Sequence, residues 1–186
     1  MTSKIFWFDT ESSGINAKTN AVLQLAGLIE IDDSIKKEIY LKMKPIQSDI
    51  IDPKALEMNH ITLSEIEKYP ETKVSILELK KILRYYVNPY TKTDKYIAAG
   101  YNIGFDMDML RATFSKVGDA YFGSWFFWPK IDVQTLVAYK ISKGLRLPNY
   151  QLGTVCKHYS IEINAHNPTS DIKATRNLYR LLRNMS

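Results

Sequence analysis

Residues 5–11 read IFWFDTE, and this stretch decides the fold class. Its four apolar residues predict a buried β-strand, and two carboxylates follow at Asp9 and Glu11. Because side chains alternate along a strand, Asp9 and Glu11 project from the same side. Two carboxylates at the end of a buried strand repel each other and are costly unless a cation lies between them. Hard oxygen ligands favour Mg²⁺ or Mn²⁺ over zinc, whereas a lone D-x-E is also common at exposed strand ends with solvated acids.

The pattern around this stretch predicts an α/β layered domain. In residues 74–87 the apolar side chains of Val74, Leu77, Ile82 and Tyr85 fall near one helical stripe, with three basic side chains off it. Strands are expected at 4–10, 21–31, 38–43 and 96–101, and helices at 74–87, 105–117, 135–142, 150–159 and 170–184.

The composition is that of an ordinary globular protein. The 186 residues are 45% apolar and 24% charged, which is enough for one sizeable core. The single cysteine, Cys156, excludes an internal disulfide and a thiolate zinc cage. No apolar run approaches the ~20 residues of a membrane span, and the N-terminus lacks a signal-peptide layout. We therefore expect a soluble, cytoplasmic protein that does not bind membranes.

The net charge of +5 is unevenly distributed. Residues 130–186 hold nine basic and three acidic side chains, whereas residues 1–129 hold 16 and 17. Such a basic C-terminal third predicts a face that attracts a polyanion, and the alternative is simple solubility charge.

Two further acids occupy settings like that of the first pair. Asp106 follows a predicted strand and turn, at a strand's carboxyl end, where open α/β sheets place their ligands. Asp171 lies in the first turn of the last predicted helix, and His166 lies in the loop before it. The alternatives are a first-turn helix acid for Asp106 and a plain loop histidine for His166. Asp108 should point away from Asp106 into solvent.

Together these pieces resemble the three motifs of the DnaQ-like exonucleases, in the branch called DEDDh. The matching elements are D-x-E at 9–11, N-x-x-F-D at 102–106 and H-x(4)-D at 166–171. Residues 9–14, DTESSG, are similar to the family's D-T-E-T-T-G opening, and 51–66 and 131–132 resemble further family segments. Tyr101 stands where a histidine is often seen, and Pro168 replaces the usual alanine of H-x-A-x-x-D.

The resemblance implies a ribonuclease H-like fold, a mixed five-stranded sheet flanked by helices, in a single domain over residues 1–186. It implies a 3′–5′ exonuclease that releases nucleoside 5′-monophosphates from the 3′ ends of single-stranded nucleic acid, with DNA favoured. Two divalent cations, Mg²⁺ or Mn²⁺, are the implied cofactors. Asp9 would bridge them, Glu11 and Asp171 would complete one site, Asp106 would hold the second, and His166 would be the general base.

Substrate contacts are expected at the turn after the first strand and at two other loops. The resemblance suggests Ile15 as a wedge between the last two bases, and the alternative for the whole set is a core or capping role. The expected contact residues are Thr10, Ser12, Ser13, Gly14, Ile15, Asn59, His60 and Asn102. The aromatic stretch 121–128 would stack bases or, more commonly, belong to the core.

Other functions fit parts of this pattern. One is a protein that binds nucleic-acid ends without cutting them, and another is an RNA-trimming exoribonuclease of the same fold. Several relatives act as homodimers or as subunits of a DNA polymerase, so either assembly is a further expectation for this chain.

Overall fold

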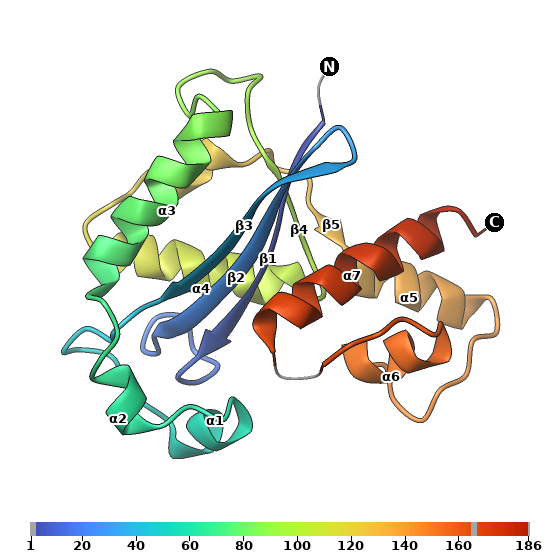
Figure 1. Cartoon of the computed structure of the whole chain (residues 1–186), viewed down its shortest axis with the longest axis horizontal. Helices are drawn as coiled ribbons and strands as arrows, with labels where there is room; N and C mark the ends of the chain where they lie inside the picture. Colours follow the sequence, from blue (N-terminus) through green and yellow to red (C-terminus); the bar gives the residue numbers. More distant parts are fainter. Residues whose placement is uncertain (1–2, 165–166, 186) are drawn as a thin grey trace.

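A mixed five-stranded sheet runs through the centre of the molecule, in the order β3-β2-β1-β4-β5 (Figure 1). This computed structural model describes residues 3–164 and 167–185. Strand β2 is antiparallel to β1 and β3, whereas β1, β4 and β5 run parallel to one another. The predicted mixed sheet is confirmed. The strands are β1 (Lys4–Ser12), β2 (Val22–Ile31), β3 (Ser34–Lys42), β4 (Ile97–Gly100) and β5 (Ile131–Asp132).

A tight turn joins β2 to β3. Its two residues, Asp32 and Asp33, both have positive φ angles of 48° and 63°, as a two-residue hairpin turn with the right twist requires. Strand β3 begins at Ser34, earlier than the predicted residue 38. Its first five side chains are all exposed, so no apolar alternation marks this part of the strand.

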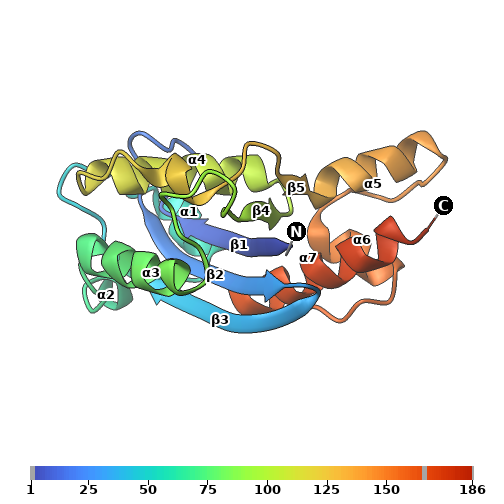
Figure 2. The ribbon, with the colours of Figure 1, turned by 90° about the horizontal axis from the view of Figure 1, so that it is seen from above.

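Helices cover both faces of the sheet (Figures 1 and 2). Helices α3 and α4 pack on one face and α5, α6 and α7 on the other, while α1 and α2 lie beyond the end of β1. The helices are α1 (Pro53–Met58), α2 (Leu63–Ile66), α3 (Thr72–Tyr86), α4 (Ile103–Lys116), α5 (Val133–Ser142), α6 (Leu152–His158) and α7 (Pro168–Arg183), with a 3₁₀ turn η1 (Phe122–Trp125).

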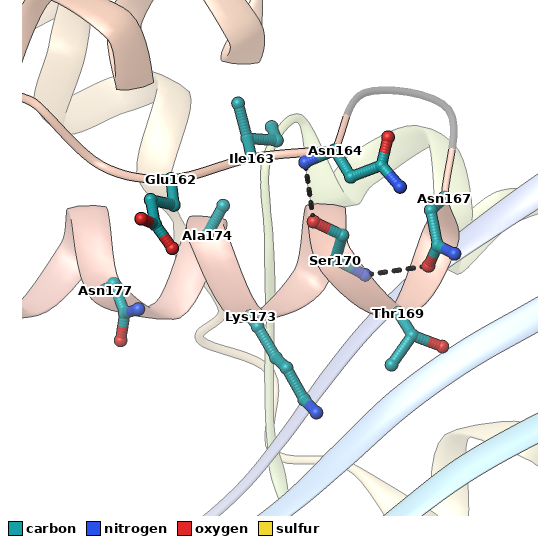
Figure 3. Close-up of a pocket in the computed structure, with 9 residues that line it drawn as sticks. All are labelled: Glu162, Ile163, Asn164, Asn167, Thr169, Ser170, Lys173, Ala174 and Asn177. Atoms are coloured by element: carbon teal, nitrogen blue, oxygen red, sulfur yellow. Dashed lines mark hydrogen bonds between the residues drawn. The ribbon is translucent and has the colours of Figure 1, made fainter.

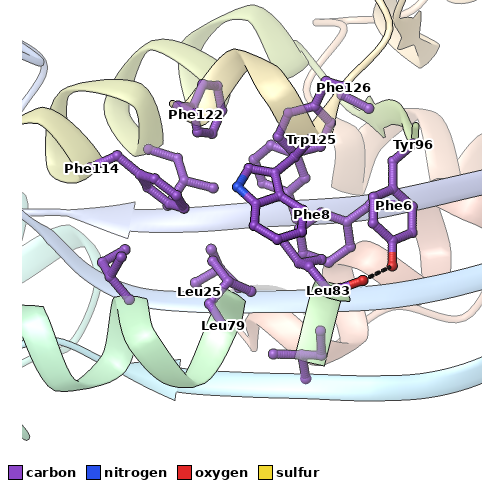
Figure 4. Close-up of a cluster of buried hydrophobic side chains, with 14 of the residues drawn as sticks. Phe6, Phe8, Leu25, Leu79, Leu83, Tyr96, Phe114, Phe122, Trp125 and Phe126 are labelled. Carbon is purple, nitrogen blue, oxygen red and sulfur yellow. Dashed lines mark hydrogen bonds between the residues drawn. The ribbon is translucent and has the colours of Figure 1, made fainter. Parts of the chain in front are cut away.

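The alternation of β1 divides the core into two layers. Phe6 and Phe8 point into the layer under α3 and α4, whereas Ile5 and Trp7 point into the layer under α5, α6 and α7. The first layer is rich in aromatic rings (Figure 4). There Phe6 and Phe8 stack at 4.9 Å between centroids, and the buried Tyr96 hydroxyl donates to the Leu83 carbonyl oxygen at 2.9 Å.

Most of the expected apolar stripe of α3 faces solvent, which corrects the sequence-based expectation, and only Ile82 of its four residues packs against the core. Leu77 is 57% exposed and Tyr85 is 82% exposed, and Val74 is exposed as well. The buried face consists of Thr72, Ser75, Ile76, Leu79 and Leu83.

The aromatic stretch 121–128 is divided between core and surface. Phe122, Trp125 and Phe126 are buried and pack on the first core layer. Tyr121 and Trp128 are exposed. The expected core role therefore holds for three of the six aromatic residues in this stretch. Among the described helices, none has the length and apolar character needed to cross a bilayer.

Candidate active site

Four carboxylates lie at the edge of the sheet where the parallel strands end. Asp9 and Glu11 belong to the last part of β1, and Asp106 lies in the first turn of α4, directly after β4. Because β1 and β4 are parallel, with Phe6 beside Ala98, their carboxyl ends meet at the same edge. Asp171 comes from the first turn of α7, which packs against β1 and β2. The fold thus brings together the four acids that the sequence singles out.

A close approach of backbones makes this arrangement possible. A Cβ atom at Gly100 would lie 2.9 Å from the Phe8 carbonyl oxygen, so β4 can end beside β1 only with glycine at this position. The chain then turns at Asn102, which has a left-handed conformation with φ 59°, and enters α4. Asparagine tolerates this conformation well, and Asn102 is exposed at the helix start.

The four carboxylates interact electrostatically. Burial raises the pKa of Asp9 well above its usual range, and the negative charges of Asp106, Glu11 and Asp171 raise it further. Burial, followed by the charges of Asp171 and Asp106, raises the pKa of Glu11 to about 7. The site is therefore destabilised by its own negative charge, which is the condition in which cation binding is favourable.

Thr10 holds Asp106 in place. The Thr10 backbone N–H donates to Asp106 Oδ1 at 2.9 Å, and the Thr10 hydroxyl donates to the same oxygen at 2.7 Å. Burial raises the pKa of Asp106 to about 6, although both hydrogen bonds from Thr10 act to lower it. Thr10 was expected to contact substrate. Its buried side chain instead supports a carboxylate.

A fifth carboxylate that the sequence analysis did not single out lies beside the site. Asp132 ends β5, next to Gly100 of β4, and its charge contributes to the raised pKa of Asp106. Its Oδ1 accepts from the N–H groups of Asn102 and Gln134, both at 3.0 Å, so Asp132 fixes the start of α4 and caps α5. The resemblance of residues 131–132 to a family segment was the signal in the sequence that pointed to Asp132.

The turn after β1 is held mainly by its own hydrogen bonds. The Ser12 hydroxyl donates to the Gly14 carbonyl oxygen, and the Ser13 hydroxyl donates to the Ile50 carbonyl oxygen, both at 2.7 Å. A Cβ atom at Gly14 would lie 2.6 Å from the Asn20 side chain, so only glycine fits there. The Ser12 hydroxyl is thus used inside the turn, and the Ser13 hydroxyl ties the turn to Ile50.

Asn59 and Ile15 flank this turn. The Asn59 side-chain amide donates to the Ser12 carbonyl oxygen at 3.0 Å, which ties the end of α1 to the end of β1. The next residue, His60, is exposed and has a positive φ angle of 53°. Ile15 is 89% exposed and borders a groove of about 790 Å³ between residues 15–18 and the side of α4 from Phe105 to Lys116. We call this the α4 groove.

Three of the four basic residues of α7 pair with acids, so this helix adds little free charge to the polyanion-binding face predicted for residues 130–186. The buried Arg176 pairs with Glu30, whose other partner is the Trp7 indole N–H at 2.9 Å. Lys173 pairs with Glu38 at 2.8 Å and Arg183 pairs with Asp33 at 3.3 Å. Each of these acids belongs to the β2–β3 hairpin.

The predicted general base, His166, lies outside the described residues. Asn164 and Asn167, on either side of residues 165–166, are linked through Ser170 (Figure 3). The Asn164 N–H donates to Ser170 Oγ at 2.8 Å, and the Ser170 N–H donates to Asn167 Oδ1 at 3.1 Å, which caps α7. The polar pocket of about 720 Å³ beside this cap is lined by none of the four carboxylates.

The donor chemistry of the site fits hard divalent cations. Carboxylate oxygens are the ligands that Mg²⁺ and Mn²⁺ prefer, and these carboxylates repel one another. Over residues 3–164 and 167–185, however, no three His, Cys, Asp or Glu side chains form a group that could hold a metal ion in this arrangement. Asp106 directs one oxygen to Thr10, so at most its second oxygen is available to a cation.

Comparisons with known proteins agree with this architecture. Residues 6–179 match the exonuclease (RNase T) family model. Exonuclease I from Methylocaldum szegediense has a TM-score of 0.80 at 19% identity, over 99% of this chain and 41% of that one. Escherichia coli exonuclease I in complex with a dT13 oligonucleotide has a TM-score of 0.78 at 20% identity, over 98% and 41%.

A zinc-bound complex of the Escherichia coli enzyme with single-stranded DNA has a TM-score of 0.81 at 19% identity, over 99% of this chain and 41% of that one. The chain therefore spans about two fifths of the length of these solved structures. No curated protein matches the sequence.

Proposed function

We propose, from the premise that this chain belongs to the exonuclease family, that it is a metal-dependent 3′–5′ exonuclease of single-stranded nucleic acid, with DNA favoured. One observation carries the proposal: Asp9 lies half-buried among the charges of Asp106, Glu11 and Asp171, which come from three separate elements. A protein that only binds nucleic-acid ends has no need of such a repulsive cluster. The dT13 complex of a structural relative supports single-stranded DNA as the substrate.

The carboxylates are the proposed ligands of two divalent cations, Mg²⁺ or Mn²⁺. Asp9 would be shared, Glu11 and Asp171 would complete one site, and Asp106 would serve the second through the oxygen that Thr10 leaves available. When bound, the cations supply positive charge against the phosphodiester that is hydrolysed. Because the pKa values of Asp9, Glu11 and Asp106 are raised, cation binding should release protons and strengthen as the pH rises.

The chain's own residues would perform the remaining steps. His166, five residues before Asp171 in the H-x(4)-D motif, would take the proton of the attacking water, as an imidazole near neutral pH can. Ile15 would separate the last two bases at the mouth of the α4 groove, whose lining includes the cations Lys18 and Arg111. Both can contact phosphates.

The first test follows the digestion of a 5′-labelled single-stranded oligonucleotide with Mn²⁺. A 3′–5′ exonuclease shortens the labelled strand stepwise and releases nucleoside 5′-monophosphates, and EDTA or Asp9→Asn abolishes both. Binding without cleavage would instead support the end-binding protein. Faster shortening of RNA than of DNA would support an exoribonuclease.

The general base has a test of its own. We expect His166→Ala to lower kcat by about two to four decades while leaving Mn²⁺ binding intact. The matched control is His158→Ala, because His158 is exposed on α6, where its ring lies against that of Tyr159. Wild-type turnover in the His166 variant would refute this role.

Assembly is a separate prediction. A homodimer would show twice the chain mass in light scattering, and a polymerase subunit would be retained on an immobilised polymerase. Neither assembly is needed for the carboxylate site, whose members all come from one chain.

A further inference from the structure

A second groove runs along the outer face of α3. Three adjoining hollows of about 450, 270 and 390 Å³ share Lys80 in their linings. Their other shared residues are Leu77, Arg84, Asp119 and Tyr121, which link each hollow to the next. We call the combined surface the α3 groove. It lies between α3 on one side and residues 117–125 on the other.

The lining of the α3 groove is positively charged. Lys73, Lys80, Lys81 and Arg84 line it, and Asp119 is the one carboxylate among its described lining residues. The ion pair between Lys80 and Asp119 neutralises one lysine. Three cations therefore face the groove without an acidic partner among its described lining residues, which gives it the charge expected of a surface that contacts a polyanion.

Exposed aromatic rings alternate with these cations. Tyr85, Tyr90 and Tyr121 line the groove and are each more than three quarters exposed. The Arg84 guanidinium lies 5.8 Å from the centroid of the Tyr90 ring and donates to its hydroxyl at 3.4 Å. This contact holds an accessible ring beside a cation. Aromatic rings and cations along one groove are the combination on which single strands stack their bases and place their phosphates.

Consecutive segments of the chain line the α4 groove and the α3 groove. The α4 groove starts near the carboxylates, beside Phe105, and ends at Lys116. The next two residues, Val117 and Gly118, line the α3 groove. Helix α4 has 14 residues and therefore spans about 20 Å from the catalytic edge to this junction. A strand that leaves the active site along α4 would reach the α3 groove.

We propose that the α3 groove binds single-stranded nucleic acid and holds the part of the strand that lies 5′ of the nucleotide being removed. The direction of the strand rests on the proposed exonuclease function, but the binding itself does not. The exposed tyrosines favour a strand with stacking bases over an acidic peptide, which needs only the cations. The groove would let the enzyme keep a long substrate between successive cleavages.

The test measures equilibrium binding in EDTA, where no cleavage occurs. Two double variants, Lys81→Gln with Arg84→Gln and Tyr90→Ala with Tyr121→Ala, change only exposed side chains. We expect each to weaken the Kd for a fluorescent oligothymidylate of about 20 nucleotides roughly tenfold and to leave a four-nucleotide probe nearly unchanged. The first variant should also reduce the slope of log K against log salt by about 1.4, because two phosphate contacts are lost.

The control is Lys143→Gln with Lys157→Gln, which removes the same charge from exposed positions on the α5 and α6 side. An equal loss in this control, or an unchanged Kd for the long probe in both groove variants, would overturn the proposal. If the groove variants lose affinity for a polyglutamate peptide but not for the oligonucleotide, the occupant is an acidic protein and the proposal is wrong. Binding without any cleavage by the wild type would refute the exonuclease function alone.

Discussion

Thr10 provides two hydrogen bonds to one oxygen of Asp106, and only one of them depends on its side chain. We expect Thr10→Val to keep the shape and the backbone bond but to lose the hydroxyl. A hydrogen bond to a charged group is worth about 1.5–3 kcal/mol, so kcat should fall roughly tenfold or more if the bond fixes Asp106 for catalysis. Steady-state kinetics with Mn²⁺ measures this effect. Thr10→Ser keeps the hydroxyl and is the matched control, and equal kcat values for the two variants would contradict the role.

Glu11 makes the stability of the metal-free protein depend on pH. Its pKa rises from 4.5 to about 7 in the folded state because of burial, Asp171 and Asp106. Between these two pKa values the folded state thus keeps a proton that the unfolded chain releases. The stability that this proton provides is fully present below the unfolded pKa and is lost as the pH rises through about 7. The raised pKa values of Asp9 and Asp106 act in the same direction.

We therefore expect the protein in EDTA to have a lower Tm at about pH 8 than at about pH 5, and Glu11→Gln to remove part of this loss. At about pH 8, Glu11→Gln should raise the free energy of unfolding by about 2 kcal/mol, measured by urea unfolding at both pH values. Glu162→Gln is the control, since Glu162 is exposed and forms no ion pair with another of the described residues. A variant with the pH profile of the wild type would show that the pKa of Glu11 is not raised in the folded state.

At the scale of single residues, the sequence predicts which acids converge but not what supports them. The period of a strand places Asp9 and Glu11 on one side, and the end of a parallel strand places Asp106 near them. The role of Thr10 could not be predicted, because its partner is 96 residues away in the sequence. For His166 the H-x(4)-D motif alone supports the role of general base, and its position in the site stays a prediction.

Helix α3 shows why an apolar stripe can mispredict the buried face of an element. The Thr72 hydroxyl donates to the Lys44 carbonyl oxygen, and the Ser75 hydroxyl donates to the Lys42 carbonyl oxygen. These polar residues therefore belong to the buried face, which a hydrophobic pattern assigns to solvent. Because this partly polar face of α3 is turned toward the sheet, Leu77 and Tyr85 remain exposed, and they line the α3 groove.

Two of the ion pairs of helix α7 differ strongly in burial, and we expect them to differ in free energy. Arg176→Met leaves Glu30 buried without its cation, which should destabilise the protein by about 3–5 kcal/mol. Lys173→Met, one turn away, removes an exposed pair with Glu38 and should cost about 0–1 kcal/mol. Urea unfolding of both variants measures the difference. Equal losses would mean that the buried pair does not anchor α7 to the β2–β3 hairpin.

At the scale of the whole molecule, strand β1 contributes side chains to both core layers and so links them. The mixed five-stranded sheet with flanking helices was predictable through the family resemblance. The position of the grooves was not predictable, since each is formed by segments distant in sequence, such as residues 15–18 with α4. Pattern alone places residues on elements, whereas grooves depend on how elements pack.

Because β1 contributes Phe6 and Phe8 to one layer and Ile5 and Trp7 to the other, the two layers should unfold together. Leu79 of α3 and Leu178 of α7 are fully buried in opposite layers. We expect Leu79→Ala and Leu178→Ala each to destabilise the protein by about 2–5 kcal/mol. In both variants, urea transitions followed by near-UV and far-UV circular dichroism should coincide. Two separate transitions in either variant would show that the layers on the two faces of the sheet are independent folding units.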